Sequence, residues 1–210
     1  MLYVLDIDDT LILERDYVYS GFSAVDRWLR KNYELTGFLE KAWHLFESGR
    51  RRKIFDTFLD EFGFNEYGMI DNLVRVYREH KPQIKLFPDA ERFLTRHKRR
   101  NLAIISDGYS STQWAKIESL DLRPQVDRII ITDDWGTDFW KPNSRSFVTI
   151  QKSLPFEQCV YVADNPLKDF KAPEALGWSP SIRIRREGSL HYNLSTPESC
   201  TEIATFDEIV

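Results

Sequence analysis

Four short apolar runs constrain what this chain can fold into. They are LYVLDID (2–8), NLAIISD (101–107), DRIIITD (127–133) and CVYVAD (159–164). Each run is nearly continuous in Val, Ile and Leu, which is typical of a strand that is buried on both faces. Segments with helical spacing of apolar residues follow the later runs. Strand alternating with helix predicts a doubly wound α/β fold with a mainly parallel, Rossmann-like sheet.

One long segment, residues 14–84, breaks this alternation and contains no convincing strand. Its apolar residues recur at helical spacing in FLEKAWHLFESG (38–49), IFDTFLDEF (54–62) and YGMIDNLVRVYREH (67–80). This spacing predicts three or four amphipathic helices inserted directly after the first strand. We therefore expect an α/β core domain formed by residues 1–13 and 85–210, and an all-helical cap domain formed by residues 14–84.

Composition excludes several classes of function. The formal net charge of −4 gives no general reason to expect a nucleic-acid partner. The two cysteines, Cys159 and Cys200, form no CxxC pair, which argues against a thiolate zinc site or a disulfide framework. No signal peptide and no apolar run of about 20 residues is evident, so we expect no membrane partner and a cytoplasmic protein. Nothing in the sequence specifies an oligomeric state.

Polar residues follow the predicted strands at the points where the strands end. Because ligands of open parallel sheets bind outside the carboxyl ends of the strands, these residues are expected to meet at one edge. Clustered carboxylates are costly to bury unless a cation is present, and oxygen-only ligands suit a hard cation such as Mg²⁺. The residues concerned are Asp6, Asp8, Ser106, Lys141, Asp164 and Asp169.

Four motifs in order resemble those of the haloacid dehalogenase (HAD) superfamily, subfamily I with a helical C1 cap. DIDDT (6–10) resembles its first motif, SDG (106–108) its second, KPNSRSF (141–147) its third and DNPLKD (164–169) its fourth. The sequence departs from the usual pattern at Ala163, where Gly is usual, and at Asp107, where Asn is frequent. Neither departure removes a functional group.

The resemblance implies a role for each matching residue. Asp6 would be the nucleophile that forms an aspartyl-phosphate, and Asp8 the general acid/base. Mg²⁺ would be held by Asp6, the backbone carbonyl of Asp8, and Asp164. Phosphate oxygens would be held by the Ser106 side chain, the N–H groups of Asp107 and Gly108, and Lys141. Asp169 would orient Lys141 or a water at the metal, and Thr10 would have a structural role within the motif.

These roles predict a Mg²⁺-dependent phosphatase that acts on a small phosphomonoester, either a sugar phosphate or a nucleoside monophosphate. Asp8 favours phosphate chemistry over dehalogenation, because a halide leaving group needs no proton. A phosphomutase remains an alternative, since it uses the same two aspartates. A phospho-accepting signalling domain and a catalytically silent scaffold are further alternatives. The long helical insert argues against the former, and the intact set of site residues argues against the latter.

Most of the remaining polar features are interpreted as structural. Asp9 is interpreted as a turn stabiliser and stays outside the site. The basic run RRRK (50–53) is interpreted as a solvated helix face, with a substrate clamp as the alternative. The basic stretch RIRREGSLHYN (183–193) is loop-like, and the sequence assigns it no function. The histidines have no ligand-like spacing and are interpreted as surface or hydrogen-bonded residues. They are His44, His80, His97 and His191.

Overall fold

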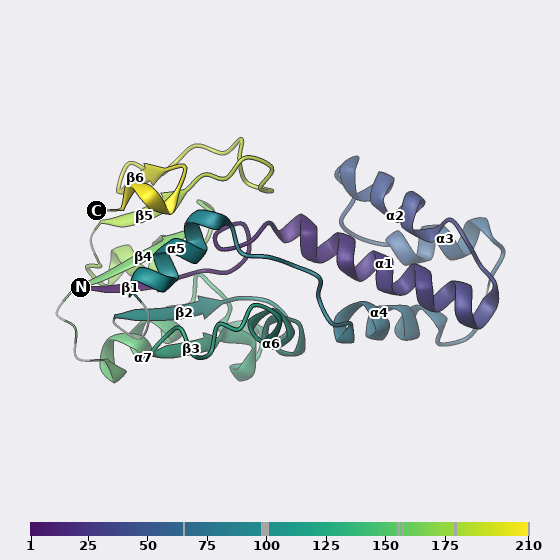
Figure 1. Cartoon of the computed structure of the whole chain (residues 1–210), viewed down its shortest axis with the longest axis horizontal. Coiled ribbons are helices and arrows are strands. Elements are labelled where there is room, and N and C mark those ends of the chain that lie inside the picture. Colours follow the sequence, from purple (N-terminus) through teal and green to yellow (C-terminus); the bar gives the residue numbers. More distant parts are fainter. Residues whose placement is uncertain (65, 98–100, 155, 157, 179, 210) are drawn as a thin grey trace. The chain divides into compact units, whose positions relative to one another are not determined.

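The chain divides into two compact units. A computed structural model describes residues 1–64, 66–97, 101–154, 156, 158–178 and 180–209. One unit, here called the sheet unit, comprises Met1–Glu14 and Ile84–Val210, and the other, the helical unit, comprises Arg15–Gln83. Figure 1 shows the elements of both.

The described strands of the sheet unit form one parallel sheet. They are β1 Leu2–Leu5, β2 Leu102–Ser106, β3 Arg128–Ile131, β4 Cys159–Ala163, β5 Ser181–Ile184 and β6 Cys200–Ile203. Their order is β3-β2-β1-β4-β5-β6, and every neighbouring pair is parallel. The predicted Rossmann-like α/β fold is therefore confirmed. The first four strands fall within the four apolar runs.

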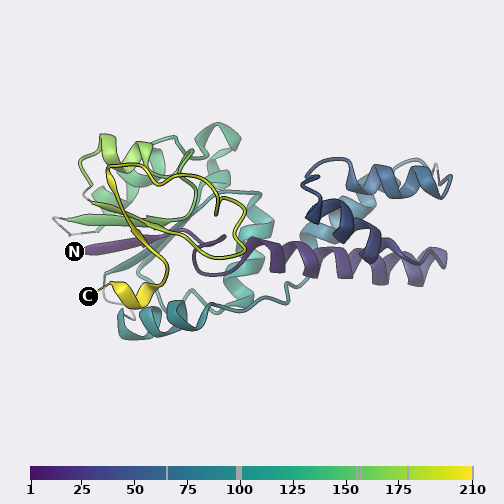
Figure 2. The same cartoon turned by 90° about the horizontal axis from the view of Figure 1, so that it is seen from above.

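Helices cover both faces of this sheet, as Figures 1 and 2 show for α5 and α7. The sheet-unit helices are α5 Pro88–His97, α6 Ser110–Ser119, α7 Arg145–Ser153 and α8 Lys171–Ala175, with short 3₁₀ turns η1 Thr132–Trp135, η2 Thr137–Phe139 and η3 Phe206–Glu208.

The residues of β1 show why the apolar runs are continuous. Leu2 and Val4 belong to a buried cluster that includes Phe147 of α7. Tyr3 packs edge-to-face on Phe93 of α5, with 5.3 Å between ring centroids. Because neighbouring residues of a strand point to opposite faces, both sets must be apolar.

The helical unit has its own apolar core. It is formed by α1 Glu14–Tyr33, whose first residue belongs to the sheet unit, together with α2 Phe38–Glu47, α3 Ile54–Glu61 and α4 Met69–Glu79. Phe38 is fully buried in this core and packs edge-to-face against Phe22 and Phe58. Gly21 lets α1 approach α4 closely, because a Cβ at this position would lie 2.4 Å from the Tyr77 ring.

Two of the strands were not predicted. The basic stretch interpreted as a loop begins within β5, and β6 lies at the edge of the sheet. Thr201 and Glu202 of β6 are exposed, so this strand lacks the continuous apolar signal that marks the buried strands. Arg183 of β5 is 1% exposed and interrupts the apolar pattern of that strand.

Candidate active site

Polar side chains gather at the carboxyl edge of the sheet because the strands are in register there. Leu5 pairs with Ile104 of β2 and with Val162 of β4. The residues that follow, Asp6 after β1 and Asp164 after β4, therefore emerge beside each other, and Ser106 ends β2.

Lys141 is the cation at the centre of this edge. Its Nζ lies 3.0 Å from Asp6 Oδ2, 2.8 Å from Asp169 Oδ1 and 2.8 Å from the Tyr161 hydroxyl. The side chain is fully buried. Burial alone would lower the pKa of Lys141, but the carboxylates of Asp169 and Asp6 outweigh burial and raise this pKa well above its usual value. The two carboxylates therefore favour the charged ammonium form of Lys141.

Three carboxylates share this buried edge. Asp6, Asp164 and Asp169 each place an oxygen within 4.8 Å of the other two. Burial raises the pKa of each of these carboxylates, and repulsion from another member of the trio raises it further.

Lys141 pairs with two of the three carboxylates, and Lys168, which also acts on the trio, is itself paired with Asp107. With His191 Nδ1 bonded to Asp164, the cluster still has fewer fixed positive charges than carboxylates. A buried set of oxygen donors with this deficit fits a hard divalent cation such as Mg²⁺.

Asp8 is held by two residues of α6. Lys116 Nζ lies 2.6 Å from both carboxylate oxygens of Asp8, and Gln113 Nε2 donates to Oδ2 at 3.2 Å. Gln113 Oε1 in turn accepts a hydrogen bond from Ser106 Oγ at 3.1 Å. Gln113 thus links the two predicted site residues Ser106 and Asp8.

Neither Gln113 nor Lys116 was predicted as a site residue from the sequence. A signal existed, because the inward-facing positions of α6 carry polar residues where a core-packing helix would carry apolar ones. The buried residues of this helix are Thr112, Gln113, Lys116 and Ile117.

Asp107 serves as an anchor through its side chain. Its carboxylate accepts hydrogen bonds from Thr132 Oγ1 at 2.8 Å and from the Lys141 backbone N–H at 3.1 Å. It also forms an ion pair with Lys168 at 2.7 Å. Burial would raise the pKa of Asp107, but the charges of Lys141 and Lys168 outweigh burial and lower it. Asp107 therefore helps to fix the position of Lys141.

Gly108 occupies a backbone position that suits glycine alone. Its φ of +116° is rarely adopted by other residues. A Cβ there would also lie 2.8 Å from Gln113 Nε2, the atom that donates to Asp8. A larger residue would disturb the link between the second motif and Asp8.

Asp9 and Thr10 hold the loop that follows Asp8. Asp9 Oδ1 accepts from the Glu14 N–H at 2.9 Å, and Oδ2 accepts from the Leu190 N–H at 2.7 Å. Burial and repulsion from Asp164 raise the pKa of Asp9 to about 7. Thr10 is buried, and its carbonyl accepts from Arg186 Nη2 at 3.1 Å. These contacts agree with the interpretation of Asp9 as a turn stabiliser.

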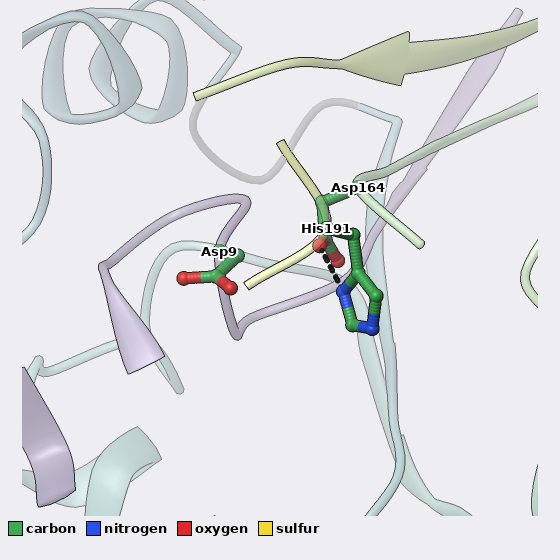
Figure 3. A group of neighbouring side chains, drawn as sticks. All are labelled: Asp9, Asp164 and His191. Atoms are coloured by element: carbon green, nitrogen blue, oxygen red, sulfur yellow. Dashed lines mark hydrogen bonds and ion pairs between the residues drawn. The ribbon is translucent and has the colours of Figure 1, made fainter. Parts of the chain in front are cut away.

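His191 reaches the site from the segment between β5 and β6. Its Nδ1 lies 2.9 Å from Asp164 Oδ2, as Figure 3 shows. This bond raises the pKa of His191, while burial acts in the opposite direction. The spacing of histidines in the sequence gave no signal for this contact, because the partner is 27 residues away and on a different element.

The sheet brings several carboxylates and a buried lysine together at its carboxyl edge. This is the edge at which parallel α/β proteins bind their ligands. Comparison with known proteins identifies the class. The chain belongs to the haloacid dehalogenase-like hydrolases, because the model of that family matches residues 1–177. The resemblance drawn from the four motifs is thereby confirmed.

Two relatives of known name match part of the chain. A glyceraldehyde 3-phosphate phosphatase of Methanocaldococcus jannaschii is 35% identical over 78 residues, which are 36% of this chain and 33% of that protein. A protein of the same name from Methanopyrus kandleri is 27% identical over 138 residues, which are 63% of this chain and 58% of that protein. Each match covers less than two thirds of the relative.

A solved structure shows the same fold. The HAD-hydrolase YfnB of Bacillus subtilis matches with a TM-score of 0.65 at 21% identity, over 99% of this chain and 95% of that chain. Within the part of the chain that the structure describes, no helix is both long and apolar enough to cross a membrane.

Proposed function

We propose that this hydrolase is a Mg²⁺-dependent phosphatase that releases phosphate from a small phosphomonoester. The observation that carries the proposal is the position of Asp6. This carboxylate is buried, lies 3.0 Å from the Lys141 ammonium and belongs to a trio with Asp164 and Asp169. Asp8, which can exchange a proton, comes two residues later.

The first chemical step would be attack by Asp6 on phosphorus. Asp8 enters this step as the carboxylic acid. An Asp6 oxygen forms a bond to phosphorus, and the bond to the leaving oxygen breaks as that oxygen takes the proton of Asp8, which leaves the Asp8 carboxylate paired with Lys116. The Lys141 ammonium offsets the negative charge that spreads over the phosphoryl oxygens. In the second step, water gives a proton to Asp8 and attacks phosphorus, which frees Asp6 and inorganic phosphate.

Mg²⁺ would be held by Asp6, Asp164 and the backbone carbonyl of Asp8, and would neutralise the charge of nucleophile and phosphate so that the two anions can approach. Ser106, with the N–H groups of Asp107 and Gly108, would bind the phosphoryl oxygens. Asp169 would hold Lys141 in place, in agreement with their 2.8 Å ion pair.

The substrate class rests on weaker support. Both named relatives are phosphatases of a phosphorylated three-carbon sugar, which favours a sugar phosphate over a nucleoside monophosphate. We propose the helical unit as the cap domain of this enzyme. Its residues would then contribute to the choice of substrate.

The test is phosphate release from p-nitrophenyl phosphate and from a panel of sugar phosphates and nucleoside monophosphates, with and without Mg²⁺. We expect turnover that requires Mg²⁺ and is lost in Asp6→Asn and in Asp8→Asn. Asp121→Asn is the matched control, because Asp121 is exposed and its positive φ suits asparagine. Turnover that survives in Asp6→Asn would contradict the proposal. Transfer of phosphate to a second sugar hydroxyl, without release, would indicate a phosphomutase instead.

A further inference from the structure

We propose that His191 is a positioning residue that orients the carboxylate of Asp164 for divalent-cation binding. The inference rests on the proposed function, in which Asp164 is a metal ligand. Asp164 is 5% exposed, and its Oδ2 is bonded to His191 Nδ1 at 2.9 Å. Because this bond occupies one oxygen, it fixes the rotation of the carboxylate and thus the direction of the other oxygen.

Arg183 fixes the distance between the two residues through their backbones. Its Nε donates to the Asp164 carbonyl at 3.0 Å, and its Nη2 donates to the His191 carbonyl at 2.8 Å. Its Nη1 donates to the Leu194 carbonyl at 2.6 Å and to Thr196 Oγ1 at 2.8 Å. One buried guanidinium thus binds the strand end that carries Asp164 and the segment that carries His191.

The same segment is also tied to the loop after β1. The Leu190 N–H donates to Asp9 Oδ2 at 2.7 Å. Arg186 donates to the Thr10 carbonyl and forms an ion pair with Asp89 at 2.8 Å. All of these segment residues lie beyond residue 177, where the match to the family model ends. His191 therefore belongs to a part of the site that the family match does not cover.

A second metal site at Asp9, Asp164 and His191 is the competing interpretation, since their donor atoms lie within 4.8 Å of one another. The contacts of Asp9 argue against it, because each of its oxygens already accepts a backbone N–H. In Figure 3 the imidazole of His191 lies against Asp164, while Asp9 stands apart from that pair. The geometry therefore favours orientation of Asp164 over direct ligation by His191.

The test measures binding of Mn²⁺, used as a paramagnetic substitute for Mg²⁺, to the metal-free full chain by electron paramagnetic resonance. His191→Phe keeps a ring but removes the donor, and we expect its Kd for Mn²⁺ to rise about 10- to 100-fold. His191→Asn places an amide N–H near the position of Nδ1 and should restore much of the affinity. His44→Phe, at an exposed histidine of the helical unit, is the matched control and should bind as the unsubstituted protein does.

Three results would overturn the inference. One is an unchanged Kd for Mn²⁺ in His191→Phe. Another is an equal loss of affinity in His191→Phe and His191→Asn, which would show that the hydrogen bond is not the cause. A third is the hyperfine coupling of a directly bound imidazole nitrogen in the Mn²⁺ spectrum. Failure of the unsubstituted chain to bind Mn²⁺ at all would instead remove the proposed metal site, and this inference with it.

Discussion

Lys116 places its ammonium 2.6 Å from both carboxylate oxygens of Asp8, although the two residues are 108 positions apart. Lys116 is 2% exposed and lies on α6 of the sheet unit. The proposed general acid/base is therefore held by a buried charge from the same unit. This pair links the proton chemistry of Asp8 to the packing of one helix.

Replacement of Lys116 by methionine should impair both stability and turnover. Breaking a buried ion pair costs about 3–5 kcal/mol, and we expect the low end because Asp8 is partly exposed. Turnover should fall by tenfold or more, since Asp8 loses its fixed orientation. Urea unfolding and phosphate-release kinetics would measure the two effects. In an Asp8→Asn background the same replacement should cost much less, and an undiminished cost would refute a role through Asp8.

Replacement of Lys141 by methionine should make stability depend more strongly on pH. The change leaves Asp6 and Asp169 buried without their cation, so their pKa values rise further above the usual 3.8. A group with a raised pKa binds its proton more tightly in the folded state, so stability falls as the pH rises above about 4. In urea unfolding with EDTA, we expect a loss of about 3–5 kcal/mol at pH 8 and a smaller loss at pH 5. Equal losses at both pH values would contradict this account.

Replacement of Asp89 by asparagine should also cost more at high pH, but for a different reason: it removes a carboxylate whose pKa is lowered in the folded protein. Burial would raise the pKa of Asp89, but the Phe206 N–H and the Arg186 charge outweigh burial and lower it. The stabilisation is therefore present above the unfolded pKa near 3.8 and is lost as the pH falls through the lower folded value. We expect a cost of about 3 kcal/mol at pH 7 that shrinks toward pH 3. Asp207→Asn, in the exposed pair with Arg92, is the control and should change stability little.

Replacement of Gly21 by alanine should destabilise the helical unit. In an ordinary helix interior this change stabilises by about 0.5–1 kcal/mol. Here the new methyl group would meet the Tyr77 ring at 2.4 Å, and overpacking of this kind costs about 1–3 kcal/mol. Thermal unfolding, followed by circular dichroism, would show whether Gly21→Ala lowers or raises the stability. Arg27→Ala, at an exposed position of the same helix, serves as the control. A Gly21→Ala protein that is more stable than the unsubstituted one would contradict this prediction and show that α1 and α4 can move apart without a cost in stability.

The strands that could be predicted are those that are buried on both faces. A strand buried on both faces must be continuously apolar, so β1, β2, β3 and β4 stand out in the sequence. The outer strands β5 and β6 do not, because β5 carries a buried arginine and β6 faces solvent along most of its length. Their place in the sheet depends on contacts that no local pattern encodes.

The same distinction applies to the candidate site. Asp6, Ser106 and Asp164 could be placed together from topology alone, because parallel strands bring their carboxyl ends to one edge. Lys116 and His191 could not, since one lies inside a helix and the other in an irregular segment. Lys116 belongs to the site because it contacts Asp8, and His191 because it contacts Asp164. Both contacts form only when the chain folds.

The four hydrogen bonds of Arg183 also have a consequence for the order in which the protein is made. Translation proceeds from the amino end, so β1 to β4 and their acidic loops leave the ribosome before Arg183 and His191 do. During that interval Asp164 has no imidazole partner and Asp9 has no Leu190 N–H. The carboxylate of Asp164 and that of Asp9 therefore each lack one contact until the segment after β5 has been made. The contacts that complete the acidic edge can therefore form only late in biosynthesis.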